Sequence, residues 1–150
     1  MPNHEAYMRL ALEEARLAKA AGEVPVGAVM VHGGKIIAAY HNLRETTCDP
    51  TAHAELLAMR EAARVLSTRR LSGCTLYVTL EPCPMCAGAI VMAQVDNCFF
   101  AAFDARQGCC GSVYDIPQDP AFSHRTRIVG GILEEEAKAL LQEFFNTRRT

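Results

Sequence analysis

Apolar positions near the N-terminus of the chain recur at the spacing of an α-helix. They lie three or four residues apart, so a helix would gather them on one face. These positions are Met8, Ala11, Leu12, Ala15 and Ala18. Asn3 can cap the start of such a helix and Gly22 can end it. The pattern predicts an amphipathic helix between Asn3 and Gly22 with one buried face.

The next apolar run, over residues 24–31, is rich in β-branched side chains. Gly33-Gly34 follows it and leads into a second run at residues 35–40. Two such runs joined by a pair of glycines are typical of a β-hairpin. We expect a hairpin here, followed by a loop over residues 41–48.

A second helix is predicted to begin at Asp49-Pro50, because aspartate is a good N-cap and proline suits the first helical position. Helical spacing also defines the apolar stripe that this helix would bury. The stripe consists of Ala52, Leu56, Met59, Ala63 and Leu66. We expect the helix to end before Gly73.

Strands and helices alternate along the rest of the chain. Residues 74–80 are predicted to form a strand, and a turn at Pro82-Cys83-Pro84 opens a third helix that reaches about Val91. Residues 98–102 and 127–129 are short strand candidates, and residues 134–146 form a final helix with an acidic start. The long segment 103–125 is rich in Gly and Pro, which favours a functional loop with a turn of helix.

This alternation predicts an α/β layered architecture, with one hairpin at the start and parallel strand pairing afterwards. No internal repeat, low-complexity stretch or linker divides the 150 residues. We therefore expect residues 1–150 to form a single domain.

Composition adds little that is specific. Half of the residues are hydrophobic and 21% are charged, which is typical of a soluble globular domain. No stretch approaches the ~20 apolar residues of a membrane-spanning helix, and no export signal is present, so we expect a cytoplasmic protein without a membrane partner. The seven cysteines are an odd number, which favours reduced thiols. Cys74 and Cys98 are predicted to lie in the core, whereas Cys48, Cys109 and Cys110 lie in predicted loops without an assigned role.

The net charge of −2 does not by itself indicate a nucleic-acid partner. Arginines are nevertheless grouped along the chain. The groups are Arg64, Arg69 and Arg70, then Arg125 and Arg127, then Arg148 and Arg149. Each group taken alone is better explained as a solvated face or as positive charge at the end of a helix.

The most informative motif is His53-Ala54-Glu55 followed, after residues 56–81, by Pro82-Cys83-Pro84-Met85-Cys86. It offers one imidazole and two thiolates as zinc ligands, and one carboxylate that the metal does not need. Structural zinc sites close with four protein ligands, whereas catalytic ones use three and leave a position for water. Zinc lowers the pKa of that water, and a nearby carboxylate can move its proton.

A lone Cys-x-x-Cys would instead favour half of a zinc ribbon or a redox pair. No second Cys-x-x-Cys or His pair completes a ribbon, and His-x-Glu with Pro-Cys-x-x-Cys is typical of zinc-dependent nucleobase deaminases. The predicted elements place His53 and Glu55 in the first turn of one helix, and Cys83 and Cys86 in the first turn of the next. We expect these two helix N-termini to face each other across a sheet, where their dipoles stabilise thiolates.

The sequence as a whole resembles the tRNA-specific adenosine deaminases, which are members of the cytidine deaminase-like zinc enzymes. The likeness lies in Glu-Val-Pro-Val-Gly-Ala at 23–28, Asp-Pro-Thr-Ala-His-Ala-Glu at 49–55 and the segment 76–88. It continues in residues 108–112, His124-Arg125 and Phe144-Phe145. Cys109-Cys110, Ser123 and Arg106 depart from the family pattern, which has small residues, asparagine and lysine there. The resemblance implies a three-layer α/β/α fold around a mixed sheet of about five strands.

The resemblance also implies the roles of the site residues. His53, Cys83 and Cys86 would hold one zinc per chain, and Glu55 would be the proton shuttle while zinc-bound hydroxide attacks C6 of adenosine. Further residues would bind the substrate through their side chains or backbone. These are Asn42, Ala54, Pro82, Asp104, Ser123, Arg125, Arg148 and Arg149. The implied substrate is the wobble adenosine in the anticodon stem-loop of an arginine tRNA, converted to inosine by a homodimer.

Two alternatives share the zinc motif. A guanine, cytosine or nucleoside deaminase would have the same zinc core but would need no basic clusters. A non-catalytic nucleic-acid-binding domain would keep zinc for stability, but such a site has no need of Glu55.

Overall fold

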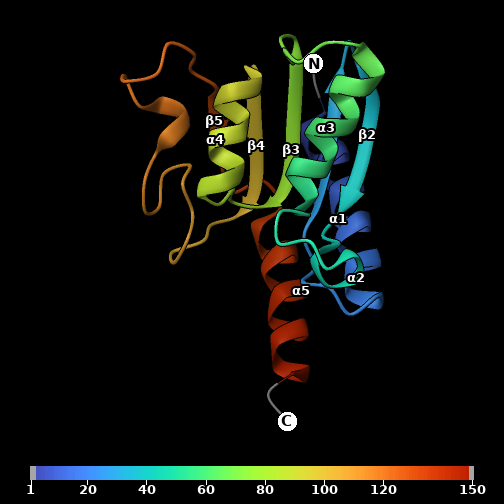
Figure 1. The fold of residues 1–150 in the computed structure, drawn as a ribbon. Coiled ribbons are helices and arrows are strands. Elements are labelled where there is room, and N and C mark those ends of the chain that lie inside the picture. Colours follow the sequence, from blue (N-terminus) through green and yellow to red (C-terminus); the bar gives the residue numbers. More distant parts are fainter. Residues whose placement is uncertain (1–2, 149–150) are drawn as a thin grey trace.

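A five-stranded mixed sheet forms the centre of the computed structural model, which describes residues 3–148 (Figure 1). The strand order is β2-β1-β3-β4-β5. The strands are β1 (Gly27–His32), β2 (Lys35–His41), β3 (Cys74–Leu80), β4 (Asn97–Ala102) and β5 (Arg127–Val129). β1 pairs antiparallel with both β2 and β3, whereas β3, β4 and β5 run parallel. Parallel pairing thus begins only at β3.

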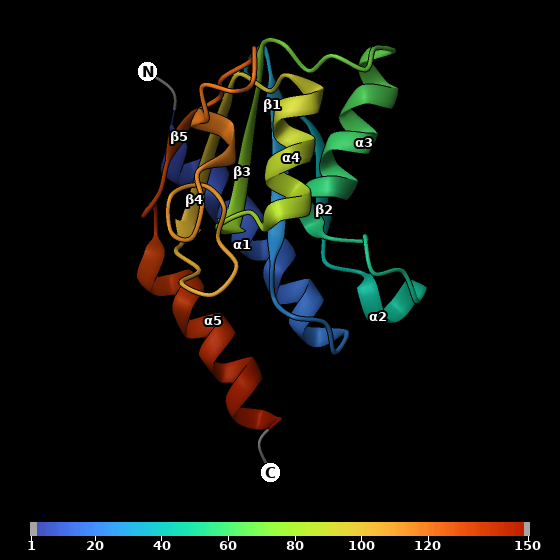
Figure 2. The same ribbon diagram turned by 60° about the vertical axis from the view of Figure 1, so that its left-hand side comes forward.

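Helices cover both faces of the sheet and make the three-layer α/β/α arrangement that the family resemblance implies. α3 (Ala54–Leu66) and α4 (Pro84–Ala93) pack on one face, and α1 (His4–Ala20) and α5 (Glu134–Thr147) on the other (Figures 1 and 2). Strand β1 shows how the sequence produces two cores. Ala28 and Met30 face α3 and α4, while Val29 and Val31 face α1 and α5. A strand buried on both faces is apolar at every position, which explains the continuous hydrophobic run.

The first helix is confirmed in full. All five residues of its predicted stripe are buried, and the Asn3 side chain caps it by accepting a hydrogen bond from the Ala6 amide at 3.0 Å. β3 and β5 have the predicted bounds, and the hairpin turns at Gly33-Gly34. The long segment after β4 carries only one turn of 3-10 helix, η1 (Ile116–Gln118).

Several boundaries differ from the prediction. β1 begins at Gly27 rather than Val24, because the Val26 amide donates a hydrogen bond of 2.8 Å to the Val24 carbonyl in a tight turn. Residues 41–48 are not a simple loop, since His41 ends β2 and α2 (Arg44–Thr47) follows.

The predicted start of the second helix at Asp49-Pro50 is wrong. The Asp49 carboxylate accepts hydrogen bonds from the Thr51 amide at 2.8 Å and the Thr51 hydroxyl at 2.7 Å, so it closes a local turn, and α3 begins only at Ala54. The buried face of α3 is correspondingly shifted. It consists of Ala54, Glu55, Ala58, Met59 and Ala62, whereas Leu56, Ala63 and Leu66 are only partly buried.

The N-termini of α3 and α4 do not face each other across the sheet. Both helices lie on the same face, side by side (Figures 1 and 2). All seven cysteines are free; Cys74 and Cys98 are buried as predicted, and so are Cys109 and Cys110. No helix within residues 3–148 combines the length and the apolar character that crossing a membrane requires.

Candidate metal centre and active site

A pocket of about 240 Å³ lies where β3 and β4 end and where α3 and α4 begin. The carboxyl ends of parallel strands and the N-termini of helices are common places for binding sites in α/β folds. The lining residues come from six segments of the chain. They are Val24, Val26, Asn42, Arg44, His53, Ala54, Glu55, Leu80, Glu81, Cys83, Asp104, Gln107 and Phe145.

His53, Cys83 and Cys86 meet beside this pocket. His53 is the N-cap of α3, Cys83 is the N-cap of α4, and Cys86 lies in the first turn of α4. His53 Nδ1 is 3.6 Å from Cys83 Sγ and 3.7 Å from Cys86 Sγ, and the three ligand atoms lie within 4.8 Å of one another. Nitrogen and sulfur ligands of one tetrahedral zinc are about 3.6 Å apart, given the usual Zn–N and Zn–S bond lengths. The three side chains therefore fit one zinc ion.

The protonation of the two thiols also favours a cation. The hydrogen bond with Cys86, aided by His53 and opposed by burial, lowers the pKa of Cys83 to about 4. The same contact with Cys83, together with burial, raises the pKa of Cys86 far above its ordinary value. Two thiolates this close would repel each other, and a bound metal would supply the positive charge that stabilises both.

Glu55 is buried in the first turn of α3 and lines the pocket next to His53 and Cys83. Burial raises the pKa of its carboxyl to about 7, although its own backbone amide and His53 both oppose the shift. A carboxyl group with a pKa near neutrality can both accept and donate a proton at physiological pH.

Three of the predicted substrate-binding residues line the pocket: Asn42, Ala54 and Asp104. The Asn42 side-chain oxygen accepts a hydrogen bond from the Arg44 amide at 3.1 Å. The Asp104 carboxylate accepts hydrogen bonds from the Arg106 and Gln107 amides at 3.0 and 3.1 Å. Sequence reasoning missed Arg44, Glu81 and Gln107 as lining residues, and only the position of Glu81, directly before Pro82-Cys83, was a usable signal.

Other predicted residues lie elsewhere. Pro82 is buried behind Cys83, and its carbonyl accepts a hydrogen bond from the Cys109 amide at 2.8 Å. Ser123 and Arg125 flank His124, whose Nε2 contacts the Val95 carbonyl at 2.8 Å, beyond the C-terminal end of α4. These two residues thus lie at the opposite end of α4 from the cysteines.

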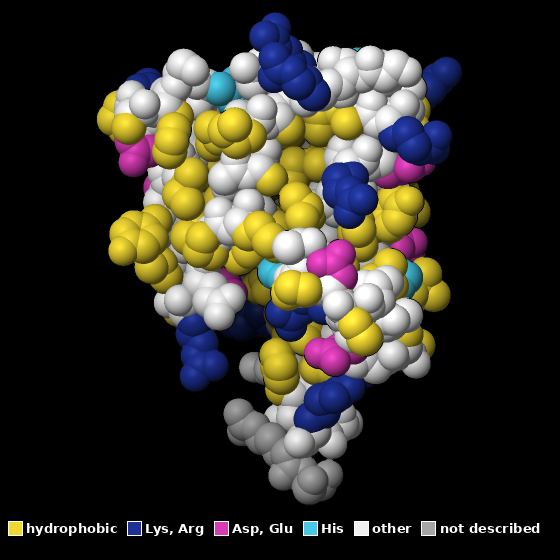
Figure 3. Space-filling model, in the orientation of Figure 1, with side chains coloured by type: hydrophobic (Ala, Val, Ile, Leu, Met, Phe, Trp, Pro, Cys, Tyr) yellow, Lys and Arg dark blue, Asp and Glu magenta, His cyan; other side chains and the backbone are white. Residues whose placement is uncertain are grey.

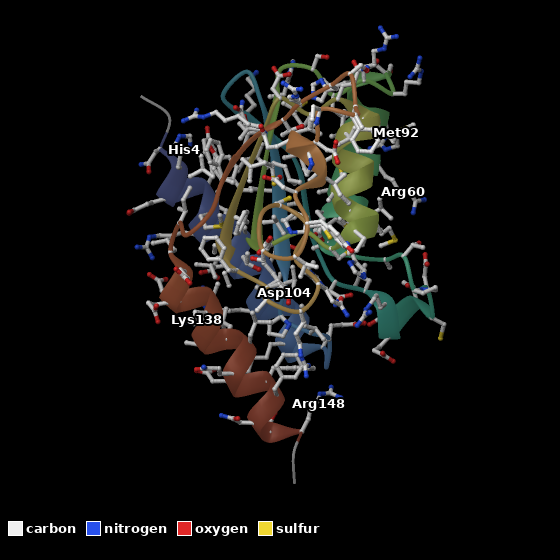
Figure 4. The ribbon with its side chains drawn as sticks, turned by 90° about the vertical axis from the view of Figure 1, so that its left-hand side faces the viewer. His4, Arg60, Met92, Asp104, Lys138 and Arg148 are labelled. Atoms are coloured by element: carbon white, nitrogen blue, oxygen red, sulfur yellow. The ribbon has the colours of Figure 1, made fainter. Side chains whose placement is uncertain are left out.

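Arg148 lies at the same end of the molecule as the pocket, beyond Asp104 (Figure 4). Its guanidinium lies over the Phe144 ring and donates a hydrogen bond of 2.6 Å to the Gly22 carbonyl. Together with Arg106 and Phe145 it borders a hollow next to the pocket, and Phe145 lines both. Arg149 lies outside the described residues.

The chain resembles known proteins in sequence and in fold. The cytidine and deoxycytidylate deaminase zinc-binding region matches residues 1–102. The tRNA-specific adenosine deaminase of Bacillus subtilis (strain 168) is 50% identical over 149 residues, 99% of this chain and 92% of that protein. A solved structure from a study of A-to-I editing by tRNA:A34 deaminases at the wobble position of transfer RNA has a TM-score of 0.88 and 40% identity, and covers 91% of this chain and 99% of that one. A guanine deaminase from Nitrosomonas europaea has a TM-score of 0.77 and 30% identity, with coverage of 93% and 83%.

Proposed function

The chain belongs to the zinc-binding cytidine and deoxycytidylate deaminases, among the tRNA-specific adenosine deaminases, and from this premise we propose that it converts adenosine to inosine at the wobble position of a tRNA. The observation that carries the chemistry is the buried Glu55 carboxyl beside a three-ligand metal cluster, inside a pocket. The near full-length likeness to the Bacillus subtilis relative carries the choice of tRNA. An arginine tRNA is the substrate that the family resemblance favours.

His53, Cys83 and Cys86 would hold the zinc, which when bound supplies an activated water and a positive charge. Glu55 then acts as the general base and general acid. Its carboxylate accepts one proton from the attacking water and passes it to the ring nitrogen of the base. It then accepts the remaining proton of that oxygen, now the hydroxyl on C6, and passes it to the amino group, which leaves as ammonia. The balanced reaction is adenosine plus water giving inosine plus ammonia. The raised pKa of Glu55 suits a group that has to take up and release protons in turn.

The base has to leave its stack to enter the pocket, and a single-stranded anticodon loop makes this step inexpensive. Asn42 and the backbone beside Ala54 and Cys83 would hold the base, and Asp104 would lie near the ribose. Arg148 borders the hollow beside the pocket, which supports its proposed contact with the RNA. Pro82, Ser123, Arg125 and Arg149 remain proposals that rest on the family resemblance.

A homodimer is the second part of the proposal, and α4 supports it. This helix is apolar on every side, yet its outer face is open: Met92 is 78% exposed, and nothing lies within 4 Å of where a side chain at Gly88 would begin. Figure 3 shows hydrophobic side chains gathered over the face that carries α3 and α4. A second copy of the chain is the proposed cover for this face. A tRNA substrate agrees with a cytoplasmic location.

The rival substrate is a free base, which the likeness to a guanine deaminase keeps in view. The test is incubation of the zinc-loaded protein with total tRNA, followed by sequencing, in which inosine is read as guanosine. The expected result is A-to-G conversion at the wobble position of one tRNA class. Efficient turnover of free guanine, cytidine or adenosine without conversion in tRNA would overturn the proposal.

A further inference from the structure

Two buried carboxylates have no part in the chemistry proposed above. The first is Glu81, 2% exposed, at the end of β3. Its Oε1 accepts hydrogen bonds from the Asp104 amide at 3.0 Å and the Ser112 hydroxyl at 2.5 Å. Its Oε2 accepts from the amides of Cys110 at 3.1 Å and Ser112 at 3.0 Å. The segment 104–112 is therefore wrapped around one carboxylate.

The second is Glu23, 1% exposed, just before β1. Its Oε1 accepts a hydrogen bond from the Glu45 amide at 3.1 Å. Its Oε2 accepts from the Thr46 amide at 2.6 Å and the Thr46 hydroxyl at 2.7 Å. Glu23 thus ties down α2, the segment that carries Arg44.

These segments form two walls of the pocket. Asn42 and Arg44 line it on the α2 side, and Asp104 and Gln107 on the side of the loop after β4. Figures 1 and 2 show α2 and this loop on opposite sides of the N-terminal end of α4. Each wall carries one residue assigned to the substrate, Asn42 or Asp104, and each is held by one buried carboxylate.

Burying a carboxylate is unfavourable unless its oxygens are fully hydrogen-bonded. Neither Glu23 nor Glu81 takes part in a salt bridge within residues 3–148. Their oxygens instead accept seven hydrogen bonds from the two walls. The four bonds at Glu81 also leave it unsuited as a second catalytic base, although it borders the pocket. Bonds of this kind fix where backbone lies, and that is what a substrate-binding wall requires.

We propose that Glu81 and Glu23 are positioning residues for the deamination, each setting the place of one pocket wall independently of the other. Glu81 acts through Asp104, and Glu23 acts through Arg44 and Asn42, whose side-chain oxygen holds the Arg44 amide. Gly108 supports the tight fit on the Glu81 side, because a Cβ there would overlap the Glu81 carboxyl carbon. This inference rests on the proposed function for its kinetic test but not for its structural one.

The structural test is amide hydrogen exchange on the zinc-loaded protein. Glutamine keeps the shape of glutamate but directs an NH2 group at backbone donors. It therefore removes hydrogen bonds to the wall without leaving a cavity. Glu81→Gln should speed exchange in residues 104–112 and leave residues 43–47 unchanged, and Glu23→Gln should do the reverse. The control is Glu13→Gln, an exposed carboxylate paired with Arg16 on α1. Exchange that rises in both walls for either variant, or in neither, would overturn the proposal.

The kinetic test is a set of double-mutant cycles on an anticodon stem-loop with adenosine at the wobble position. Each glutamine variant should lower kcat/KM about 10- to 100-fold with zinc content unchanged. Asp104→Ala lowers kcat/KM by some factor in the wild type. In the Glu81→Gln background that factor should be at least about fivefold smaller, whereas in the Glu23→Gln background it should agree with the wild-type factor within about twofold. Asn42→Ala should show the opposite pattern.

Where Glu81→Gln fails to fold, Ser112→Ala, which removes one of its four bonds, takes its place. Additive effects in every pair would mean that the carboxylates are only structural, and would overturn the proposal. An inactive wild type would instead contradict the proposed function, while the exchange experiment would still decide the inference.

Discussion

Glu55 owes its proposed role to its location more than to its chemistry as a carboxylic acid. It lies in the first turn of α3, where the helix dipole favours a negative charge. Burial acts in the opposite direction and prevails, so that the pKa rises to about 7. The residue is also two positions from His53, and both line the pocket beside the candidate zinc ligands.

Replacing Glu55 with alanine should therefore separate proton transfer from metal binding. Glu55→Ala is expected to keep one zinc per chain and to lower kcat by about 10²- to 10⁴-fold or more, because one group serves several proton transfers. Metal analysis and single-turnover kinetics on the same preparation measure both quantities. Cys86→Ser is the matched comparison, and it should lose zinc and activity together. Loss of zinc from Glu55→Ala would show that the carboxyl is a ligand.

At this scale the sequence predicted the site residues that make up a motif and missed those that depend on loops. The motif singles out His53, Glu55, Cys83 and Cys86, and helical spacing places each pair at the start of one helix. Where the two helix starts meet depends on the connections between strands. Glu23 and Glu81 could not be assigned in this way. Their hydrogen-bond partners lie more than twenty positions along the chain, in segments whose path no periodicity predicts.

Among the elements, α1 depends on one glycine of β1. A Cβ at Gly27 would overlap the Ala11 carbonyl oxygen and would lie 2.6 Å from the Ala15 amide nitrogen. The helix therefore lies directly on the strand, with Ala11 and Ala15 as its contact residues. Small residues on both elements permit this close approach.

Gly27→Ala should push α1 away from the sheet. We expect a loss of about 1–3 kcal/mol in the free energy of unfolding, the usual effect of overpacking a core. Urea unfolding measures it. Leu17→Ala, on the exposed side of the same helix, should change stability by no more than about 0.5 kcal/mol. Equal effects of the two substitutions would contradict the close contact of α1 with β1.

The α2 wall should respond to acid through Glu23. Burial alone would raise the pKa of this carboxyl, but hydrogen bonds from Thr46 and Glu45 outweigh it and lower the pKa below the ordinary value of 4.5. A group with a lowered pKa stabilises the folded state above its unfolded pKa, and this contribution is lost as pH falls through the folded pKa. The difference in Tm between wild type and Glu23→Gln should therefore be full above pH 5 and should shrink as pH drops below about 4.5. A difference that grows at low pH would have the wrong sign.

Element types were easier to predict from the sequence than element ends. The start of α3 was missed because Asp49 bonds to Thr51 in a local turn, a competing use of a side chain that suits a helix cap equally well. The local sequence pattern also could not predict on which face of the sheet each helix packs. That α3 and α4 share a face depends on the connections between β2, β3 and β4, and apolar periodicity does not encode these.

Across the whole molecule, arginines lie at both ends of the sheet. Arg44, Arg106 and Arg148 lie at the pocket or the hollow beside it. Arg127 lies at the far end of the sheet, where its guanidinium is 5.7 Å from the centre of the Phe99 ring. The sequence could not separate Arg127 from Arg148 in this way, because position along the chain does not reveal which end of a sheet a residue occupies.

The two ends should thus differ in their effect on RNA binding. Arg106→Ala combined with Arg148→Ala should raise KM for the anticodon stem-loop about 10-fold. Each phosphate contact that is lost should also reduce the slope of log K against log salt by about 0.7, the value for single strands. Arg127→Ala should leave both quantities unchanged within about twofold. Titrations at 50–200 mM salt with zinc-loaded protein measure the slopes, and unchanged zinc content excludes damage to the metal centre. An equal loss for Arg127→Ala would contradict the expected difference between Arg127 and the two arginines at the pocket end, and would indicate that the RNA also reaches Arg127.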